Sequence, residues 1–158
     1  MAAVRFNIWT DGSCNNRGVD REGGWAFLVE KNGEFHHENV GIEDKTTSSR
    51  MEMEAVYQAL KYAKKNISNS EIFIHSDSAY VVNCFLEKWY LRWIEMDYQS
   101  VKNTDKWRKI LSLMNKNNNK VKFVKVKGHA GIEQNERCDY LAGVARKMLI
   151  EQKCQLKK

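Results

Sequence analysis

Proline is absent from the chain, so no proline marks a boundary between domains. No apolar run approaches the roughly 18 residues that a membrane-spanning helix needs, so we expect no membrane partner. The opening stretch MAAVRFNIW is too short and too polar for a secretory signal peptide, and we therefore expect a cytoplasmic protein. No internal repeat or low-complexity tract interrupts the 158 residues, a length that suits one domain.

Cysteine is scarce and widely spaced. The four cysteines form no C-x-x-C pair, so the spacing of a zinc site is missing: Cys14, Cys84, Cys138 and Cys154. Scattered cysteines in a cytoplasmic chain do not indicate a disulfide framework. We expect free thiols, some of them buried.

The net charge of +6 is unevenly distributed along the chain. Residues 1–83 carry 9 basic and 12 acidic side chains, whereas residues 116–158 carry 11 basic and 4 acidic ones. This asymmetry fits a polyanionic partner, and it fits equally a lysine-rich surface that keeps the protein in solution.

The pattern of apolar residues predicts an α/β protein. Three strand-like runs come first, and Asn32-Gly33 marks a hairpin turn between the second and the third. Hairpin-linked strands followed by helix-linked strands imply a mixed sheet with helices packed on it. The expected elements are strands at 4–10, 23–32 and 34–42, a helix at 49–66, a strand at 71–76, a helical region at 78–115 broken near 95–105, a strand at 120–126 and a helix at 133–152.

Four acidic residues lie at the ends of these elements. Asp11 closes the first strand in FNIWTDGSCNN, and Asp77 closes the fourth in FIHSDS. Glu52 falls in the first turn of the first long helix, and Asp139 falls in the last helix. Ligand crevices form outside the carboxyl ends of parallel strands. If the first and fourth strands are parallel neighbours, Asp11 and Asp77 project into one crevice.

Carboxylates that converge repel one another unless a cation neutralises them. Oxygen ligands favour magnesium or manganese over zinc. A site of three or four acids holds two such ions about 3.5–4 Å apart, an arrangement that activates water on one side of a phosphodiester and stabilises the leaving oxygen on the other.

Each acid also has a purely structural interpretation. Asp11-Gly12 and Asp77-Ser78 are common turn or cap sequences. Ser49 to Glu52 matches the capping box S-x-x-E, and the neighbouring Glu54 is expected to be solvated.

Asp139 and His129 also have both a functional and a purely structural interpretation. On a helical wheel Asp139 falls at the edge of the apolar stripe, from which it reaches either a cleft beside the sheet or solvent. His129 stands in a glycine-flanked loop, which suits a proton carrier but is equally the place of an exposed histidine.

Taken together, the segments TDGSC, SSRMEMEA, SDSAYV and VKGHAGIEQNERCDYLA resemble type 1 ribonuclease H in their order and spacing. The resemblance covers residues 4 to 148 and implies the ribonuclease H-like fold, a five-stranded mixed sheet flanked by helices. It implies an endonuclease that hydrolyses the RNA strand of RNA–DNA hybrids with magnesium or manganese, leaving 5′-phosphate and 3′-hydroxyl ends. The expected organisation is one catalytic domain over 1–158, with its core at about 4–150, no separate hybrid-binding domain, no obligate protein partner and a monomeric state.

The resemblance also assigns residues. The metal-binding acids fall on Asp11, Glu52, Asp77 and Asp139, and RME selects Glu52 over Glu54. His129 matches a flexible-loop histidine that assists proton movement and product release.

Substrate contacts carry over as well. Residues that approach RNA 2′-hydroxyls, the groups that separate RNA from DNA, fall on Gly12, Ser13, Cys14 and Asn16. Thr47 and Asn103 match positions that hold a phosphate of the DNA strand, and Ser48 and Ser49 stand where many members have asparagine or glutamine. The segment 89–103 has no net charge, although bacterial members often carry a longer basic protrusion there.

Two other kinds of protein stay open on the sequence. One is a non-catalytic hybrid-binding module that kept the fold, although such a binder has no need of four acids and a histidine. The other is a different metal nuclease of the same superfamily, an exonuclease or a resolvase, whose last helix should not carry GHAG followed by NERCD.

Overall fold

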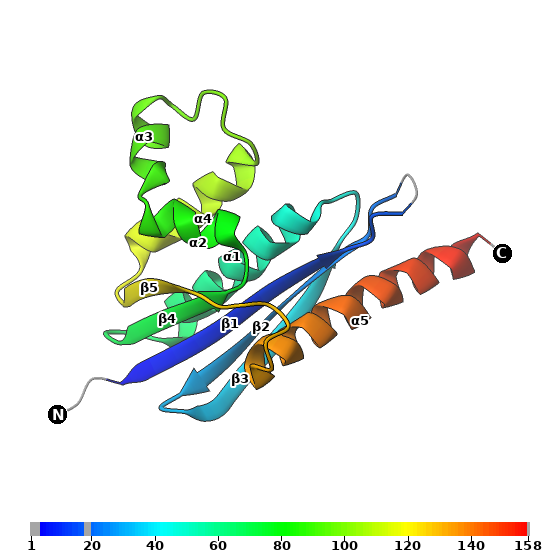
Figure 1. The fold of residues 1–158 in the computed structure, drawn as a ribbon, viewed down its shortest axis with the longest axis horizontal. Helices are drawn as coiled ribbons and strands as arrows, with labels where there is room; N and C mark the ends of the chain where they lie inside the picture. The colour runs from blue at the N-terminus through cyan, green and yellow to red at the C-terminus, as the bar shows by residue number, and fades with distance from the viewer. Residues whose placement is uncertain (1–3, 18–19, 158) are drawn as a thin grey trace.

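The structure is a computed structural model in which residues 4–17 and 20–157 are described. Five strands form one mixed sheet in the order β3-β2-β1-β4-β5 (Figure 1). The first three strands are antiparallel neighbours, and β4 and β5 run parallel to β1. This sheet confirms the expected fold class. Its strands are β1 (Arg5–Cys14), β2 (Gly23–Lys31), β3 (Glu34–Glu43), β4 (Glu71–Ser76) and β5 (Lys120–Lys125).

Helices cover both faces of the sheet. The expected helical region at 78–115 resolves into three helices, and its break falls between Glu95 and Thr104, close to where the sequence places it. No helix in the described part of the chain is long and apolar enough to cross a membrane. The helices are α1 (Ser48–Asn66), α2 (Ala79–Leu86), α3 (Trp89–Glu95), α4 (Thr104–Lys116) and α5 (Glu133–Leu156).

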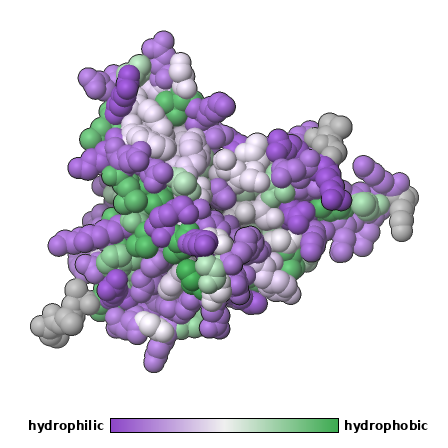
Figure 2. All heavy atoms as spheres, viewed as in Figure 1, coloured by the Kyte–Doolittle hydropathy of each residue, from purple (hydrophilic) through white to green (hydrophobic). Residues whose placement is uncertain are grey.

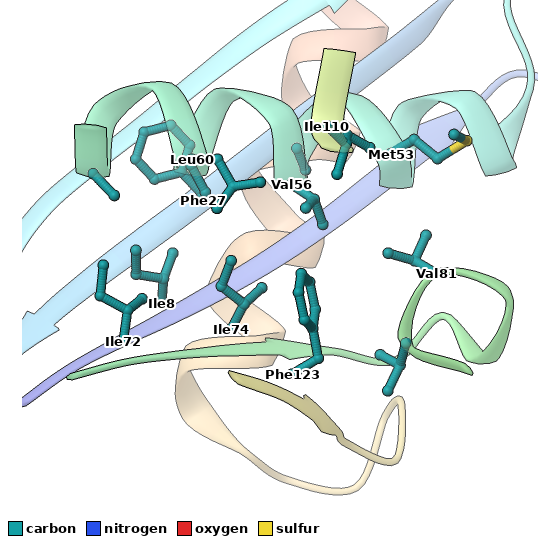
Figure 3. Close-up of a cluster of buried hydrophobic side chains, with 14 of the residues drawn as sticks. Ile8, Phe27, Met53, Val56, Leu60, Ile72, Ile74, Val81, Ile110 and Phe123 are labelled. Carbon is teal, nitrogen blue, oxygen red and sulfur yellow. The ribbon is translucent and has the colours of Figure 1, made fainter. Parts of the chain in front are cut away.

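The main core lies between the sheet and α1. Alternate residues of a strand point to opposite faces, and Ile8 of β1 and Phe27 of β2 point to the face that α1 covers. Met53, Val56 and Leu60 meet them from α1, as Figure 3 shows. Burial of this apolar stripe fixes α1 against β1, and with it the rotation of every other side chain on the helix.

A smaller core lies on the opposite face. Trp9 of β1 packs there with Cys138 and Ala142 of α5. A Cβ on Gly24 of β2 would lie 2.2 Å from the carbonyl oxygen of Ala142, so glycine allows α5 to approach the sheet backbone directly. This close approach sets the position of Asp139, which follows Cys138 on α5.

The region around α3 projects from the sheet (Figure 1). Trp89 and Trp93 are half-buried and pack against the main core, and the rings of Trp93 and Trp107 lie 5.1 Å apart. The connection to α4 contains four left-handed residues that are not glycine, Asp97, Tyr98, Ser100 and Asn103. Such residues cost free energy relative to glycine, so the tryptophan packing stabilises a strained connection.

Candidate active site

The parallel ladder between β1 and β4 stops just before two of the acids. Its last pair is Thr10 opposite Ser76, and both residues are buried. Asp11 and Asp77 are the next residues on their strands. The two carboxylates therefore lie side by side where the parallel ladder ends. Asp11 does not close its strand as expected, because β1 continues to Cys14 and stays paired with β2.

The turn after β4 leaves the carboxylate of Asp77 free. The backbone N–H of Ser78 donates to Ser76 Oγ at 3.1 Å, and Ser78 Oγ accepts from the N–H of Val81 at 3.3 Å. Ser78 is thus the N-cap of α2. Asp77-Ser78 is thus a turn and cap sequence, but Ser78 and not Asp77 supplies the capping oxygen.

The capping box expected at Ser49 to Glu52 does not form. Helix α1 begins one residue earlier, and its N-cap is Thr47, whose Oγ1 accepts from the N–H of Arg50 at 3.1 Å. Glu52 therefore lies beyond the first turn, contrary to expectation. Since another residue caps the helix, the carboxylate of Glu52 is available for a ligand.

Glu54 is not solvated as the sequence suggested. Lys106 of α4 donates to Glu54 Oε2 at 2.8 Å and to Glu43 Oε1 at 3.0 Å, and Gln58 donates to Glu54 Oε1 at 2.9 Å. Lys106 has a side chain only 6% exposed, and these two acids are the partners of its buried ammonium group. Because Glu54 is paired with Lys106, Glu52 is the acid of α1 that faces the edge of the sheet.

Asp11, Glu52 and Asp77 form one cluster. Carboxylate oxygens of the three residues lie within 4.8 Å of one another. Burial, followed by the charge of Asp77, raises the pKa of Asp11 to about 8. Burial also raises the pKa of Glu52 and of Asp77. Such a cluster disfavours its own ionised form and gains most from a bound cation.

Asp139 borders the cluster without belonging to it in this structure. It is exposed and lines a cavity of about 340 Å³ together with Ser13 and Arg146. Its charge contributes to the raised pKa of Asp11 and of Asp77, after burial and nearer groups. Asp139 is therefore exposed to solvent and also borders a cavity beside the sheet, which none of the three clustered acids lines.

The loop between β5 and α5 passes close to Asp77. A Cβ on Gly128 would lie 2.9 Å from Asp77 Oδ2, so only glycine fits here without a shift of that carboxylate. His129 follows with a left-handed φ of 54° and is exposed. The loop thus holds the imidazole at the rim of the cluster, open to solvent.

Residues expected to face the DNA strand gather around Arg50. Its Nη1 donates to Asn103 Oδ1 at 3.3 Å, and its guanidinium forms a two-pronged ion pair with Asp105. Thr47 is joined to the same arginine through its cap. Ser49 and Asn103 line a cavity of about 590 Å³ that also includes Arg92 and Lys102. Ser48, half-buried at the start of α1, is not among the residues that line this cavity.

Residues expected to face RNA continue from Asp11. Gly12 lies under the backbone of α1, and Ser13 Oγ accepts from Arg146 Nε at 3.0 Å. Cys14 Sγ lies 3.6 Å from the carbonyl oxygen of Thr46. Asn16, which is exposed, accepts from Arg21 through Oδ1 at 3.0 Å.

One cation beside the cluster has no counterpart in the residues chosen from the sequence. Lys125 ends β5 opposite Ser76, and its charge lowers the pKa of both Asp77 and Glu52 against the effect of burial. The alternation of KVKFVKV places Lys125 on the same face of β5 as buried Phe123, a signal that could have identified it.

Comparison with known proteins identifies the family of the chain. The family model described as RNase H matches residues 4–147. The ribonuclease H of Syntrophomonas wolfei is 41% identical over 147 residues, covering 90% of this chain and 96% of the relative. That of Thermoanaerobacter sp. (strain X514) is 40% identical over 140 residues, covering 85% of each chain.

Solved structures agree on the fold. LC9-RNase H1, a type 1 RNase H with the type 2 active-site motif, has a TM-score of 0.76 at 22% identity and covers 93% of this chain and 74% of its own. LC11-RNase H1 in complex with RNA/DNA hybrid has a TM-score of 0.70 at 22% identity, covering 92% and 99%.

The five-stranded mixed sheet and the acidic cluster at its edge define a protein of the ribonuclease H-like class. Within that class, the match over residues 4–147 and the relatives at about 40% identity are decisive, and the chain belongs to the RNase H family. The resemblance in the sequence motifs is thereby confirmed.

Proposed function

We propose that this protein is an endoribonuclease that hydrolyses the RNA strand of RNA–DNA hybrids, leaving 5′-phosphate and 3′-hydroxyl ends. The observation that carries the proposal is the cluster of Asp11, Glu52 and Asp77, within 4.8 Å of one another in a chain of the RNase H family. A monomer acting in the cytoplasm suffices for this activity.

The donor set fits magnesium, with manganese as a substitute. All three clustered donors are carboxylates, and hard oxygen ligands are those that these ions prefer. We assign Asp11, Glu52, Asp77 and Asp139 as the residues that hold them. Two bound ions would polarise the attacking water and stabilise the leaving 3′-oxygen.

The chain's own groups supply proton transfer and alignment. His129 is exposed at the rim of the cluster, where an imidazole can accept a proton from water and release it to solvent. Lys125 partly offsets the negative charge of the cluster, which lowers the cost of holding ionised acids together.

Two groups of residues, on either side of the acidic cluster, are assigned to recognition of the hybrid. Gly12, Ser13, Cys14 and Asn16 follow Asp11 and are assigned to the RNA strand, where 2′-hydroxyls distinguish ribose from deoxyribose. Thr47 and Asn103 are assigned to a phosphate of the DNA strand, and Ser48 and Ser49 to the minor groove of the hybrid. Lys102 and Arg92 supply positive charge in the cavity that Ser49 and Asn103 line. Cleavage then requires a ribose strand on one side and a second strand on the other.

The test is a labelled RNA–DNA hybrid incubated with and without Mg²⁺, beside duplex DNA and duplex RNA. We expect Mg²⁺-dependent cuts within the RNA strand of the hybrid alone. Asp11→Asn and Asp77→Asn should abolish cleavage while retaining hybrid binding, and His129→Ala should slow turnover by about tenfold to a hundredfold.

The alternatives give different results in the same assay. A non-catalytic hybrid-binding module would bind the hybrid and leave it intact, and another nuclease of the superfamily would cut a different duplex. Near wild-type cutting by Asp77→Asn would refute the assignment of the site.

A further inference from the structure

The last turns of α5 lie against the segment that follows β1. In Figure 1 the C-terminal end of α5 and the β1–β2 connection are at the same end of the molecule. Lys153 Nζ lies 3.3 Å from Glu22 Oε2 and 3.8 Å from Asp20 Oδ2, and it donates to Asp44 Oδ1. One ammonium group on α5 therefore joins three acids that come from two connections of the sheet.

Glu22 links Lys153 to the segment that follows β1. Its side chain is only 8% exposed, so its carboxylate depends on partners within the protein. Asn15 Nδ2 donates to Glu22 Oε1 at 3.0 Å, and the backbone N–H of Asn15 donates to the Glu22 carbonyl at 2.8 Å. Both oxygens of the carboxylate are thus occupied, one by α5 and the other by the segment after β1.

Asn15 lies between Cys14 and Asn16, two residues assigned to the RNA strand. Its own Oδ1 accepts from the N–H of Arg17 at 3.1 Å, which shapes the turn that carries Asn16. Arg146, two turns before Lys153 on the same helix, donates to Ser13 at 3.0 Å. Helix α5 therefore contacts the RNA-facing segment directly through Arg146 and indirectly through Lys153 and Glu22.

Lys153 also controls the charge of this end of the molecule. Asp20, Glu22 and Asp44 would repel one another if the ammonium were missing. Figure 2 shows a predominantly hydrophilic surface at this end of the molecule.

We propose that Lys153 is a positioning residue for recognition of the RNA strand, acting through Glu22 and Asn15 on the segment that reads ribose. The inference rests on the proposed function. Lys153 does not touch the reacting atoms, so its removal should weaken the fit of the ribose strand and leave the chemical step intact.

The test compares Lys153→Met, Lys153→Arg and Lys157→Met. Lys157, one turn further along, makes no ion pair with a described residue, so its substitution removes the same charge without the contact. We expect Lys153→Met to raise KM for the hybrid about fivefold with kcat within about twofold. Lys153→Arg should recover most of the loss, and Lys157→Met should match wild type.

Binding separates positioning from a general charge effect. With Asp77→Asn as the background, Lys153→Met should weaken binding of the hybrid but not of duplex DNA of the same sequence. Glu22→Gln should add little to Lys153→Met, because the two residues act as one unit. Equal loss for both duplexes, an equal effect of Lys157→Met, or a fall in thermal stability with unchanged KM would overturn the inference. Absence of cleavage by the wild-type protein would instead refute the proposed function.

Discussion

The backbone of Glu52 rests on Gly12 so closely that a Cβ built on the glycine would lie 2.3 Å from the Glu52 nitrogen. This contact places the start of α1 directly over the end of β1. Glu52 consequently joins Asp11 and Asp77 in one cluster although it comes from a helix.

Gly12→Ala should separate α1 from β1, because backbone atoms cannot yield to a methyl group at that distance. We expect cleavage of the hybrid to fall at least about 100-fold, and the free energy of unfolding to fall by about 1–3 kcal/mol. Initial rates and urea unfolding measure the two effects.

The matched control for stability is Gly143→Ala. A Cβ on this glycine of α5 meets no atom within 4 Å, so the variant should gain up to about 1 kcal/mol from helix propensity. A fully active Gly12→Ala would show that the close approach does not determine where Glu52 lies.

Glu52→Gln and Glu54→Gln should have opposite effects although the residues are two apart. Glu52→Gln removes a clustered carboxylate and should reduce cleavage by about 1,000-fold or more, with little loss of stability. Glu54→Gln weakens the ion pair to Lys106 and should lower thermal stability while activity persists. Rate and melting temperature measured on both proteins separate the two roles, and a reversed pattern would contradict them.

Lys106→Met should destabilise the protein, because it leaves the carboxylate of Glu54 without its buried partner. We expect a loss of about 3 kcal/mol in the free energy of unfolding, and Lys106→Met combined with Glu54→Met should recover much of it. Chemical unfolding of the three variants tests this. If the double substitution were as unstable as the single one, the loss would come from packing instead of the unpaired charge.

The metal-free protein should become less stable as the pH rises from 6.5 to 8.5. Burial among other acids raises the pKa of Asp11 to about 8, so up to about pH 8 the folded chain retains a proton that the unfolded chain has released. Stability that depends on this proton is present at low pH and is lost as the pH passes 8. His75, whose pKa burial lowers to about 4, acts in the opposite direction only below pH 6.5.

Melting temperatures in the presence of a chelator measure this effect. Asp11→Asn should flatten the slope, since the amide does not titrate. A wild-type melting temperature that rises between pH 6.5 and 8.5 would contradict the raised pKa.

Local patterns were sufficient for much of the fold and for two acids. Asp11 and Asp77 come directly after strongly apolar runs, and this pattern predicts where they meet. The end of β1 was predicted wrongly, because pairing with β2 continues the strand past Asp11 to Cys14. The first residue of α1 could not be predicted, because Thr47, Ser48 and Ser49 are all good N-caps and tertiary contacts decide among them.

Contacts between distant segments could not be read from the sequence. Lys106 lies 52 residues from Glu54, and no periodicity links them. Lys153 reaches Glu22 from 131 residues away. The left-handed conformations before α4 could not be predicted either, since a residue such as Tyr98 does not indicate a positive φ.

The most direct test of the central claim is an anomalous difference map of a crystal that contains Mn²⁺ and an RNA–DNA hybrid. The account predicts manganese peaks about 2.0–2.2 Å from carboxylate oxygens of Asp11, Glu52 and Asp77, beside a phosphate of the RNA strand. Peaks elsewhere, with these three carboxylates uncoordinated, would contradict it.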